Sequence, residues 1–565
     1  MRAIATIVDR KNNLSYDKGQ GLSLFQCHNE RLFLLWVHMN LCIKSLVQLP
    51  MKDKKRISIK EPGVLILGII LAILSAAICM QIMGQFGTAP NTSLIGAVLV
   101  MIVARIPLIA VKRFRNLERQ NYVLSMASAA GFAAANCGFV AIATMYIIGR
   151  SDLIMPMALG TLIGSMISVF ITGRIFDSKI FPAKGAWPMG TAVASTIEAG
   201  DEGGKKGFEL LQGLVVGAVA SFLGLPAAGV GIAFIANMFT MAALGVGMVL
   251  RGHSAFLFNG FDIGQSNIAQ GIMIGAGVVA LIQIVMAIRK GSKQKVDEAE
   301  YTVSDTQTIR TLVDAVGLFM IGAVAIALVT GAFGEMNWMQ FIGWVVFSGF
   351  SAAVLMILVG TSSMQSGWAP TFAVVAIFLT IGVLIGFPTL PLVVMVGYLG
   401  SVGPCFADTG VGLKTGWIIR GKGMDKNHEL YGRKQQVIIK QIGVVIGIAI
   451  AVITSMMLVN NDVIPPMSIF YADTATVAAD PALIRQLVIW AVPGAMLQAA
   501  FGSKSVGLML AAGLFINHPI YGIVILASIG LRLIIGTKHM NVRGPGLIAG
   551  DGLFGFGANI FNAFF

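Results

Sequence analysis

The chain has 565 residues, of which 56% are hydrophobic and only 12% are charged, and its net charge is +14 at neutral pH. Ordinary soluble domains have about a quarter charged residues, so the composition argues against a soluble protein and favours a membrane protein. In a soluble protein the positive charge would suggest nucleic-acid binding, but here it gathers in short loops between apolar runs, where it sets membrane topology. We therefore expect a lipid bilayer as partner and no nucleic acid.

Residues 1–60 differ in kind from the rest of the chain. The stretch "LFLLWVHMNLCI" is too short to span a bilayer, and it lacks the small-residue cleavage site of a signal peptide. The sequence "MKDKKRISIKEPG", which begins at Met51, reads like a natural start just before the first apolar run. Two interpretations stay open: a mis-assigned start, or a genuine surface extension.

Apolar runs of at least about 18 residues recur from residue 63 onward, and each can cross a hydrocarbon core of roughly 30 Å as a helix. Lipid-facing backbone must satisfy its own hydrogen bonds, so these runs predict helices. With two stretches interrupted by Gly and Pro, 208–250 and 388–403, we expect an all-α polytopic membrane protein of about 14 to 16 transmembrane helices. The clearest runs are 63–83, 93–111, 122–148, 153–171, 266–288, 311–333, 338–360, 370–387, 437–458 and a crowded region, 483–535.

The longest polar interruption, residues 289–310, divides the membrane region into halves of similar size, 61–288 and 311–565. Faint echoes between the halves, such as 125–143 with 360–378, suggest two related repeats. Basic residues before Gly63, in 289–295 and in 414–440 place these segments in the cytoplasm. We expect a multi-pass protein of the plasma (inner) membrane with a cytoplasmic N-terminus; a homodimer stays open.

Two polar, glycine-rich stretches interrupt the apolar sequence, one in each half. They are "FPAKGAWPMGTAVASTIEAGDEGGKKG" (181–207) and "GPCFADTGVGLKTG" (403–416). Pro and Gly weaken a helix, and non-helical backbone at membrane depth is tolerated only where it is buried in protein or lines a wet cavity. We therefore expect broken or re-entrant segments near Pro188 and Pro404 that meet at a central substrate site.

Four motifs follow one another from residue 121 to the C-terminus: "NYVLSMASAAG" (121–131), "WPMGTAVASTIEAG" (187–200), "FADTGVGLKTGWIIRG" (406–421) and "GPGLIAGDGLFGFGANI" (544–560). They resemble, in the same order, the N-x-V-x-x-x-A-S-A-A-G, Y-P-S-G-x-A-x-A, D-x-x-x-x-L-K-T-G-Y and G-x-G-L-I-x-G-E-G-L-W-G segments of the oligopeptide transporter superfamily. That superfamily includes the yellow-stripe-like metal-chelate transporters, and the chain is similar to a bacterial-type member.

The resemblance implies about 16 transmembrane helices in two related halves that move small peptides or metal chelates with protons. Three positions depart from the family pattern. Trp187 and Met189 stand where the family usually has Tyr and Ser, and Asp551 stands where it usually has Glu. These departures leave the particular substrate open.

Three carboxylates in glycine-interrupted segments are candidates for binding a proton or the ammonium end of a peptide: Asp408, Glu198 and Asp262. Burial favours the neutral acid and a nearby cation favours the carboxylate, so such a group can respond to both. The alternative for Asp408 and Asp262 is a helix cap. Lys414, also a candidate ligand, has the alternative of a cytoplasmic topology marker.

Uncharged residues complete the predicted substrate site. Asn121 and Asn136 lie on a small-residue helix face that either packs closely in lipid or forms the wall of a substrate path. Pro188 and Gly190 belong to the first predicted break, where they would expose backbone groups to the substrate. Arg532, in the last apolar run, either receives a peptide carboxylate or finds another partner.

The sequence thus predicts a secondary active transporter that imports small oligopeptides by alternating access. The proton gradient would supply the energy, with no cofactor and no bound metal. "GWIIRGKG" lacks the hydroxyl residue of a phosphate-binding loop, which argues against ATP hydrolysis. A metal-chelate or siderophore transporter of the yellow-stripe kind is the alternative. A passive channel and a membrane-embedded enzyme are less favoured.

Overall fold

The computed structural model describes residues 57–87, 93, 96, 97, 99, 100, 114–202, 204–291, 301–367, 369, 371–476, 481–501, 505–537 and 540–564. Residues 1–56 and most of the predicted span at 93–111 lie outside this described part. Every regular element within it is a helix, which confirms the predicted all-α class.

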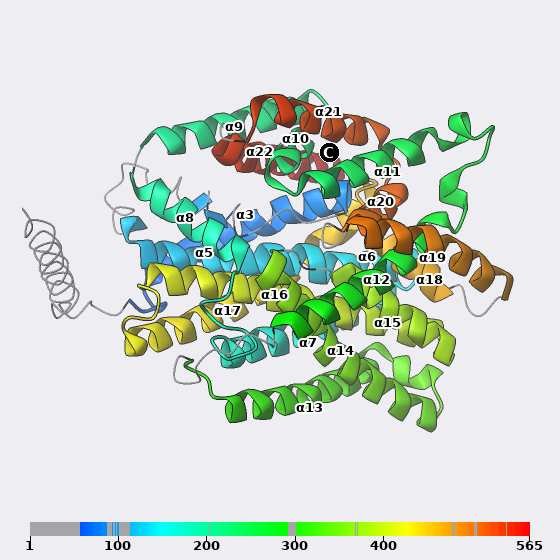
Figure 1. Ribbon diagram of the computed structural model, residues 1–565, viewed down its shortest axis with the longest axis horizontal. Helices are drawn as coiled ribbons and strands as arrows, with labels where there is room; N and C mark the ends of the chain where they lie inside the picture. The colour runs from blue at the N-terminus through cyan, green and yellow to red at the C-terminus, as the bar shows by residue number, and fades with distance from the viewer. Residues whose placement is uncertain are drawn as a thin grey trace, which may run out of the picture. The chain divides into compact units, whose positions relative to one another are not determined.

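The chain order of the elements is shown in Figure 1. In the first half of the sequence they are α3 (Pro62–Phe86), α5 (Leu117–Phe132), η2 (Ala133–Phe139), α6 (Val140–Ile147), η3 (Ser151–Leu153), α7 (Ile154–Ile175), α8 (Pro188–Glu202), α9 (Gly204–Phe222), α10 (Ala227–Ile235), α11 (Met238–Leu257), η4 (Ile263–Gln265) and α12 (Ile268–Gly291). In the second half they are α13 (Asp305–Thr330), η6 (Ala332–Glu335), α14 (Trp338–Ser366), α15 (Thr371–Ile385), α16 (Thr389–Ile419), α17 (Lys426–Asn460), α18 (Pro466–Thr476), α19 (Pro481–Phe501), α20 (Val506–Phe515), α21 (Pro519–Ile535) and α22 (Met540–Phe564).

Seven helical segments of the described part are long and apolar enough to cross a membrane. They are α3, the continuous segment from α5 through η2 to α6, the segment from η3 through α7, α13, α14, α16 and α17. Five further apolar helices have 10–17 residues. Large apolar side chains face outward, for example Ile321 (68% exposed) and Ile534 (82%). A soluble protein rarely leaves so much apolar surface in water, so the protein is polytopic. The total of about 14 to 16 crossings stays a prediction.

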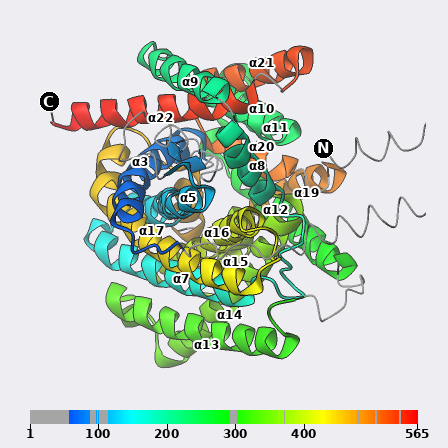
Figure 2. The same ribbon diagram turned by 90° about the vertical axis from the view of Figure 1, so that its left-hand side faces the viewer.

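Helices α5 and α16 form the interior of the bundle. Seen from one end, α3, α7 and α17 lie around them, whereas α13 and α14 lie on one side and α9, α21 and α22 on the other (Figure 2). The helical windows that contain α5 and α16 are each 94% buried. The two halves of the sequence pack into one another, because α5 contacts α16 and α17, α9 contacts α22, and α12 contacts α19. The central helices are therefore shielded from lipid and able to hold polar groups.

The predicted break at 403–416 is wrong. Helix α16 runs without interruption through this stretch, with Pro404 inside it. A single Pro removes only one backbone hydrogen bond, and the glycines serve close packing instead. A Cβ on Gly412 would collide with Lys440 and one on Gly416 with Gln436. The glycines of 403–416 therefore resemble a helix break in the sequence, but in the structure they leave space for neighbouring side chains.

The other predicted interruption is confirmed in its first part. Residues 176–187 are not helical, and Pro188 begins α8. Trp187 has a positive φ of 37° and is fully buried. Its indole N–H donates to the carbonyl of Pro182 at 3.0 Å, and its backbone N–H donates to the carbonyl of Met364 at 2.8 Å. This loop is thereby fixed against α14.

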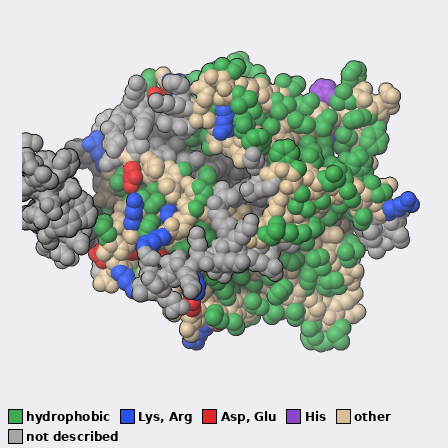
Figure 3. Space-filling model, viewed as in Figure 1, with side chains coloured by type: hydrophobic (Ala, Val, Ile, Leu, Met, Phe, Trp, Pro, Cys, Tyr) green, Lys and Arg blue, Asp and Glu red, His purple; other side chains and the backbone are tan. Residues whose placement is uncertain are grey.

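The polar ends of several helices meet at one end of the bundle. Arg119 pairs with Glu61 at 2.8 Å, and Arg433 donates to Thr302, which lies within the polar linker 289–310. Figure 3 shows most of the charged side chains of this face toward the left of the view, while the described surface to their right is mostly apolar. The segment 414–440 is not one long loop as predicted, because only residues 420–425 separate α16 from α17. Its basic residues extend into both helices.

Candidate functional site

A row of polar side chains runs along one face of α17. Glu429, Arg433, Gln436 and Lys440 are spaced by four, three and four residues, so they share one helix face. Each is at most 4% exposed. Asp408 of α16 and Arg420, which follows the last residue of α16, lie twelve residues apart and flank a matching face of that helix. We call these six residues, with Ser125 and Ser128 of α5, the polar seam.

The inner end of the polar seam is a buried ion pair. Lys440 Nζ donates to Asp408 Oδ2 at 2.5 Å, and the two side chains are 0% and 2% exposed. The hydroxyls of Ser93 and Ser128 donate to Asp408 Oδ1 at 3.2 and 2.9 Å. Lys440 also donates to Ser128 Oγ at 3.2 Å. Both carboxylate oxygens are therefore satisfied within the protein.

Such a pair is costly to bury and sensitive to change. Taking two charges out of water costs several kcal/mol each, and their attraction offsets this only with good geometry and additional hydrogen bonds. Asp408 and Lys440 meet both conditions. Ionisable groups inside a membrane protein mark ion or substrate pathways by default.

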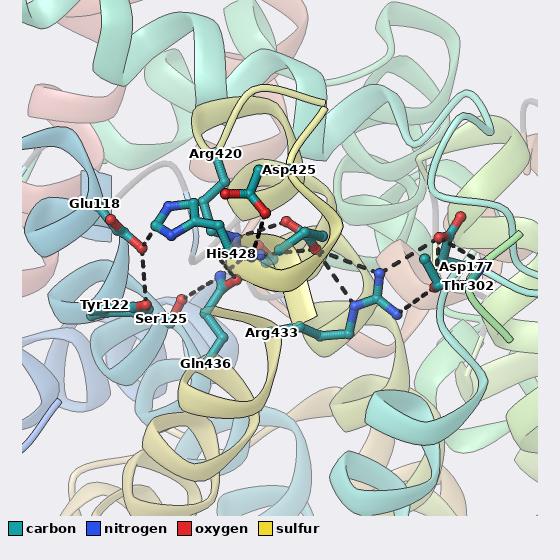
Figure 4. A network of polar contacts seen from close by, with 12 residues as sticks. Glu118, Tyr122, Ser125, Asp177, Thr302, Arg420, Asp425, His428, Arg433 and Gln436 are labelled. Atoms are coloured by element: carbon teal, nitrogen blue, oxygen red, sulfur yellow. Dashed lines mark hydrogen bonds and ion pairs between the residues drawn. The ribbon is translucent and has the colours of Figure 1, made fainter. Parts of the chain in front are cut away.

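The outer end of the polar seam is a second buried pair. Arg420 donates from Nε and Nη2 to the two carboxylate oxygens of Glu429, at 2.7 and 3.1 Å. Its third contact is to Gln436 Oε1 at 2.8 Å, and Gln436 Nε2 donates onward to Ser125 Oγ at 3.0 Å. Figure 4 shows these contacts. Gln436 thus joins the outer pair to α5.

Further contacts attach the outer pair to three other segments. Arg433 lies 3.5 Å from Glu429 and 3.6 Å from Asp177, and it donates to Thr302 Oγ1 at 3.0 Å. On the opposite side, His428 Nε2 lies 3.6 Å from a Glu118 carboxylate oxygen, to which Tyr122 donates at 3.1 Å (Figure 4). We call this group the end cluster, consisting of Glu118, Tyr122, Asp177, Thr302, Arg420, His428, Glu429 and Arg433. It ties α5, the loop after α7, Thr302 of the polar linker and α17 together.

Three predicted residues meet where α8 packs on α16. Lys414 is buried, and its ammonium donates to the carbonyls of Ala183 and Gly185 at 2.7 and 2.9 Å. A Cβ on Gly190 would press on the Lys414 side chain, and Pro188 begins the same helix. Lys414 therefore fastens the loop 176–187 to α16 and is more than a surface marker.

The other two predicted carboxylates lie in different surroundings from Asp408. Glu198 is exposed on α8. Asp262 caps the short turn η4 by accepting from Gly264 N at 2.8 Å, and it pairs with Arg251 at 2.5 Å. The contacts of Asp262 are therefore those of a helix cap, which is the alternative that the sequence analysis gives for this residue. Of the three carboxylates, Asp408 alone belongs to the polar seam.

The two predicted asparagines are buried. Asn121 is 0% exposed, and neither its side-chain oxygen nor its nitrogen has a hydrogen-bond partner within the described residues. Asn136 lies in the π-helical segment η2 and donates to the carbonyl of Phe132 at 3.5 Å. Insertions of this kind into α-helices are frequent at functional sites.

A separate pair of charges holds the short helix α10. Asp551 of α22 accepts from Ala228 N, in the first turn of α10, at 2.6 Å. Arg532 of α21 donates to the carbonyls of Ala233 and Ala236, at the other end, at 2.8 and 2.7 Å. A carboxylate suits a helix N-terminus and a cation suits a C-terminus. The partners of the Arg532 guanidinium are thus these two backbone carbonyls.

The sequence interpretation missed Lys440, Gln436, Glu429, Arg433 and Arg420. Arg420, Arg433 and Lys440 belong to the basic residues of 414–440, which the sequence analysis interprets as topology signals, and it assigns no role to Glu429 or Gln436. Their spacing carried the missing signal, because polar residues at four, seven and eleven positions from Glu429 define one helix face. The same pattern within a long apolar helix indicates a buried polar surface. Among the described residues, no group of three or more His, Cys, Asp or Glu side chains could hold a metal ion.

The fold and the polar seam define a class, a polytopic helical membrane protein with ionisable groups in its interior. Residues 63–289 match the family model described as OPT oligopeptide transporter protein, which confirms the resemblance to that family over this part of the chain. A comparison with curated proteins gives no match. Members of this family are transporters, so the match indicates oligopeptide-type transport.

Proposed function

We propose that the protein is a secondary active transporter that imports small oligopeptides or peptide-like substrates together with protons by alternating access. The buried Asp408–Lys440 pair is the observation that carries the proposal. It supplies a titratable acid and a cation in the interior of the bundle, between helices from both halves of the sequence.

In the proposed cycle, the pair acts as the coupling element. With Asp408 ionised, the pair holds α16, α17 and α5 together. A proton on Asp408 neutralises it and leaves the Lys440 ammonium without a counter-charge, which is costly in a buried site. A substrate carboxylate can then take the place of Asp408 beside Lys440. Proton entry would supply the energy, since one charge crossing a potential of 100 mV gains about 2.3 kcal/mol.

The end cluster is the proposed gate at one end of the pathway. Its contacts are charged and join four segments that the helices alone do not connect. Charged groups can separate at low cost once water reaches them, because water replaces each lost contact. The basic segments at this end support a cytoplasmic position for this gate, by the positive-inside rule.

Asp408 is the favoured proton site among the three predicted carboxylates. Glu198 is exposed, so its protonation would have little effect on the packing of the helices. Asp262 is held by Arg251 and by the turn that it caps. Only Asp408 joins the central helices, so only its protonation would alter how they pack.

Uptake into proteoliposomes tests the proposal. Labelled di- and tripeptides should accumulate when an inward proton gradient is imposed, and this stimulation should vanish in Asp408→Asn. Glu198→Gln is the matched control, because it makes the same chemical change on an exposed side chain. If Asp408→Asn keeps the full response to the gradient, Asp408 has no coupling role.

The yellow-stripe alternative rests on the same family resemblance and concerns the substrate alone. An iron or nickel chelate that competes with peptide uptake, or that replaces it, would assign the protein to that branch. Peptides competing among themselves, with chelates without effect, would support the oligopeptide assignment.

A further inference from the structure

A small cavity lies between η2, α6, α15, α16 and α18, away from the charged part of the polar seam. The residues that matter for its chemistry are Asn136, Cys137, Thr144, Phe372, Gly400 and Tyr471. It has room for about one water-sized group. That is the size of a single carbonyl or amino group and much less than a whole peptide.

Tyr471 supplies an unused polar group to this cavity. The side chain is 1% exposed, and its hydroxyl has no hydrogen-bond partner in the part of the chain that the structure describes. A buried hydroxyl without a partner is costly, roughly 1–3 kcal/mol, and calls for an explanation. A ligand that enters the cavity would satisfy it.

Asn136 gives the cavity a second polar group. It projects from the π-helical segment, and its hydrogen bond to Phe132 is long, at 3.5 Å. No charged side chain lines the cavity. A phenol and a carboxamide can each donate a hydrogen bond, so together they match an uncharged acceptor such as the carbonyl group of a peptide amide.

The cavity adjoins the ion pair through α16. Gly400 lies eight residues before Asp408, about 12 Å along the helix. Cys137 lines the cavity, and its Sγ lies 3.7 Å from Sγ of Cys405, one helical turn before Asp408. A change in the cavity therefore reaches the helix that carries Asp408 through direct packing.

We propose that this cavity binds the carbonyl group of a substrate backbone amide, with the Tyr471 hydroxyl and the Asn136 carboxamide as hydrogen-bond donors. The inference rests on the proposed transport function and adds a neutral recognition site to the charged one at Asp408 and Lys440. It gives a role to the Tyr471 hydroxyl, which has no hydrogen-bond partner among the described residues.

Two variants test the site by different means. Tyr471→Phe removes only the hydroxyl. Gly400→Ala adds one methyl group to the cavity, where a Cβ meets nothing within 4 Å. The controls are Tyr398→Phe, whose hydroxyl donates to the carbonyl of Phe319, and Gly317→Ala on α13, which also meets nothing within 4 Å.

The measurements are peptide-dependent thermal stabilisation of the purified protein and the KM for uptake into proteoliposomes. The probe is a tripeptide found to be transported by the wild type, compared with its N-methylated analogues. Tyr471→Phe and Gly400→Ala should each raise Kd and KM roughly three- to tenfold, as expected for one neutral hydrogen bond. One N-methylated analogue should bind wild type and Tyr471→Phe equally, and the two controls should behave as wild type.

The outcomes separate the two proposals. If the wild type binds the tripeptide and both cavity variants bind it equally well, the cavity assignment is overturned while transport stands. If the wild type binds no peptide, both fall. If Gly400→Ala lowers the melting temperature without ligand, Tyr471→Phe alone decides, because it breaks no hydrogen bond of the protein.

Discussion

Asp408 and Asp551 are both buried carboxylates, 4% and 3% exposed, on helices rich in glycine, yet they are compensated in different ways. Asp408 faces the ammonium of Lys440 and two hydroxyls. Asp551 faces a backbone N–H at the start of α10, whose other end is held by Arg532. One carboxylate is paired with a charge and the other with a helix terminus.

The difference indicates which region can respond to a proton. A neutral acid at Asp408 leaves Lys440 as a buried, uncompensated charge, so protonation has a large effect there. A neutral acid at Asp551 still has a carbonyl oxygen to accept from Ala228 N and loses only the smaller interaction with the helix dipole. Coupling is therefore expected at the polar seam, whereas the α10 region serves as fixed structure.

The largest expected effect is that of Asp408→Asn. Because Lys440 loses its counter-charge, the free energy of unfolding should fall by about 3–5 kcal/mol. A thermal melt in detergent would show this as a much lower melting temperature. The double variant Asp408→Asn/Lys440→Met should recover most of the stability and none of the proton-driven uptake. A single variant as stable as wild type would contradict the ion pair.

Crowding the ion pair should have an intermediate effect. Gly412→Ala places a methyl group against Lys440, and overpacking of this kind costs about 1–3 kcal/mol. Uptake driven by a proton gradient should fall as well. Gly317→Ala is the matched control, since its Cβ meets nothing within 4 Å. Equal melting temperatures for the two variants would show that α16 and α17 can move apart without a loss of stability, which would contradict this prediction.

The same amide substitution in the second region should matter much less. Asp551→Asn keeps an oxygen that can accept from Ala228 N, so we expect a loss of less than about 1 kcal/mol. The response of uptake to pH should stay as in wild type. If Asp551→Asn abolished the pH response while Asp408→Asn kept it, the assignment of the two regions would be reversed.

The smallest effect is expected for a carboxylate that belongs to neither region. Glu198→Gln changes an exposed side chain on α8, and surface substitutions of this kind rarely alter stability. The melting temperature and the proton-driven uptake should match wild type. A loss of uptake without a loss of stability would instead place Glu198 on the substrate path.

Several parts of the site were predictable from the sequence. Asp408 stood out because a carboxylate in a highly apolar segment is expensive and therefore informative. Lys414, Pro188 and Gly190 were placed in two stretches expected to meet, and they do meet where α8 packs on α16. Lys440 was missed because it ends a run of basic residues that resembles a topology signal.

The sequence by itself determined that the protein is helical and lies in a membrane, because long apolar runs leave no other way to satisfy the backbone in lipid. Residues 63–289 also match the family model described as OPT oligopeptide transporter protein. Only the tertiary structure decided the partners of each buried charge. Lys440 and Asp408 are 32 residues apart, and Ser128 lies 280 residues from Asp408. Such pairings depend on which helix faces which, and the local pattern of one helix does not contain that information.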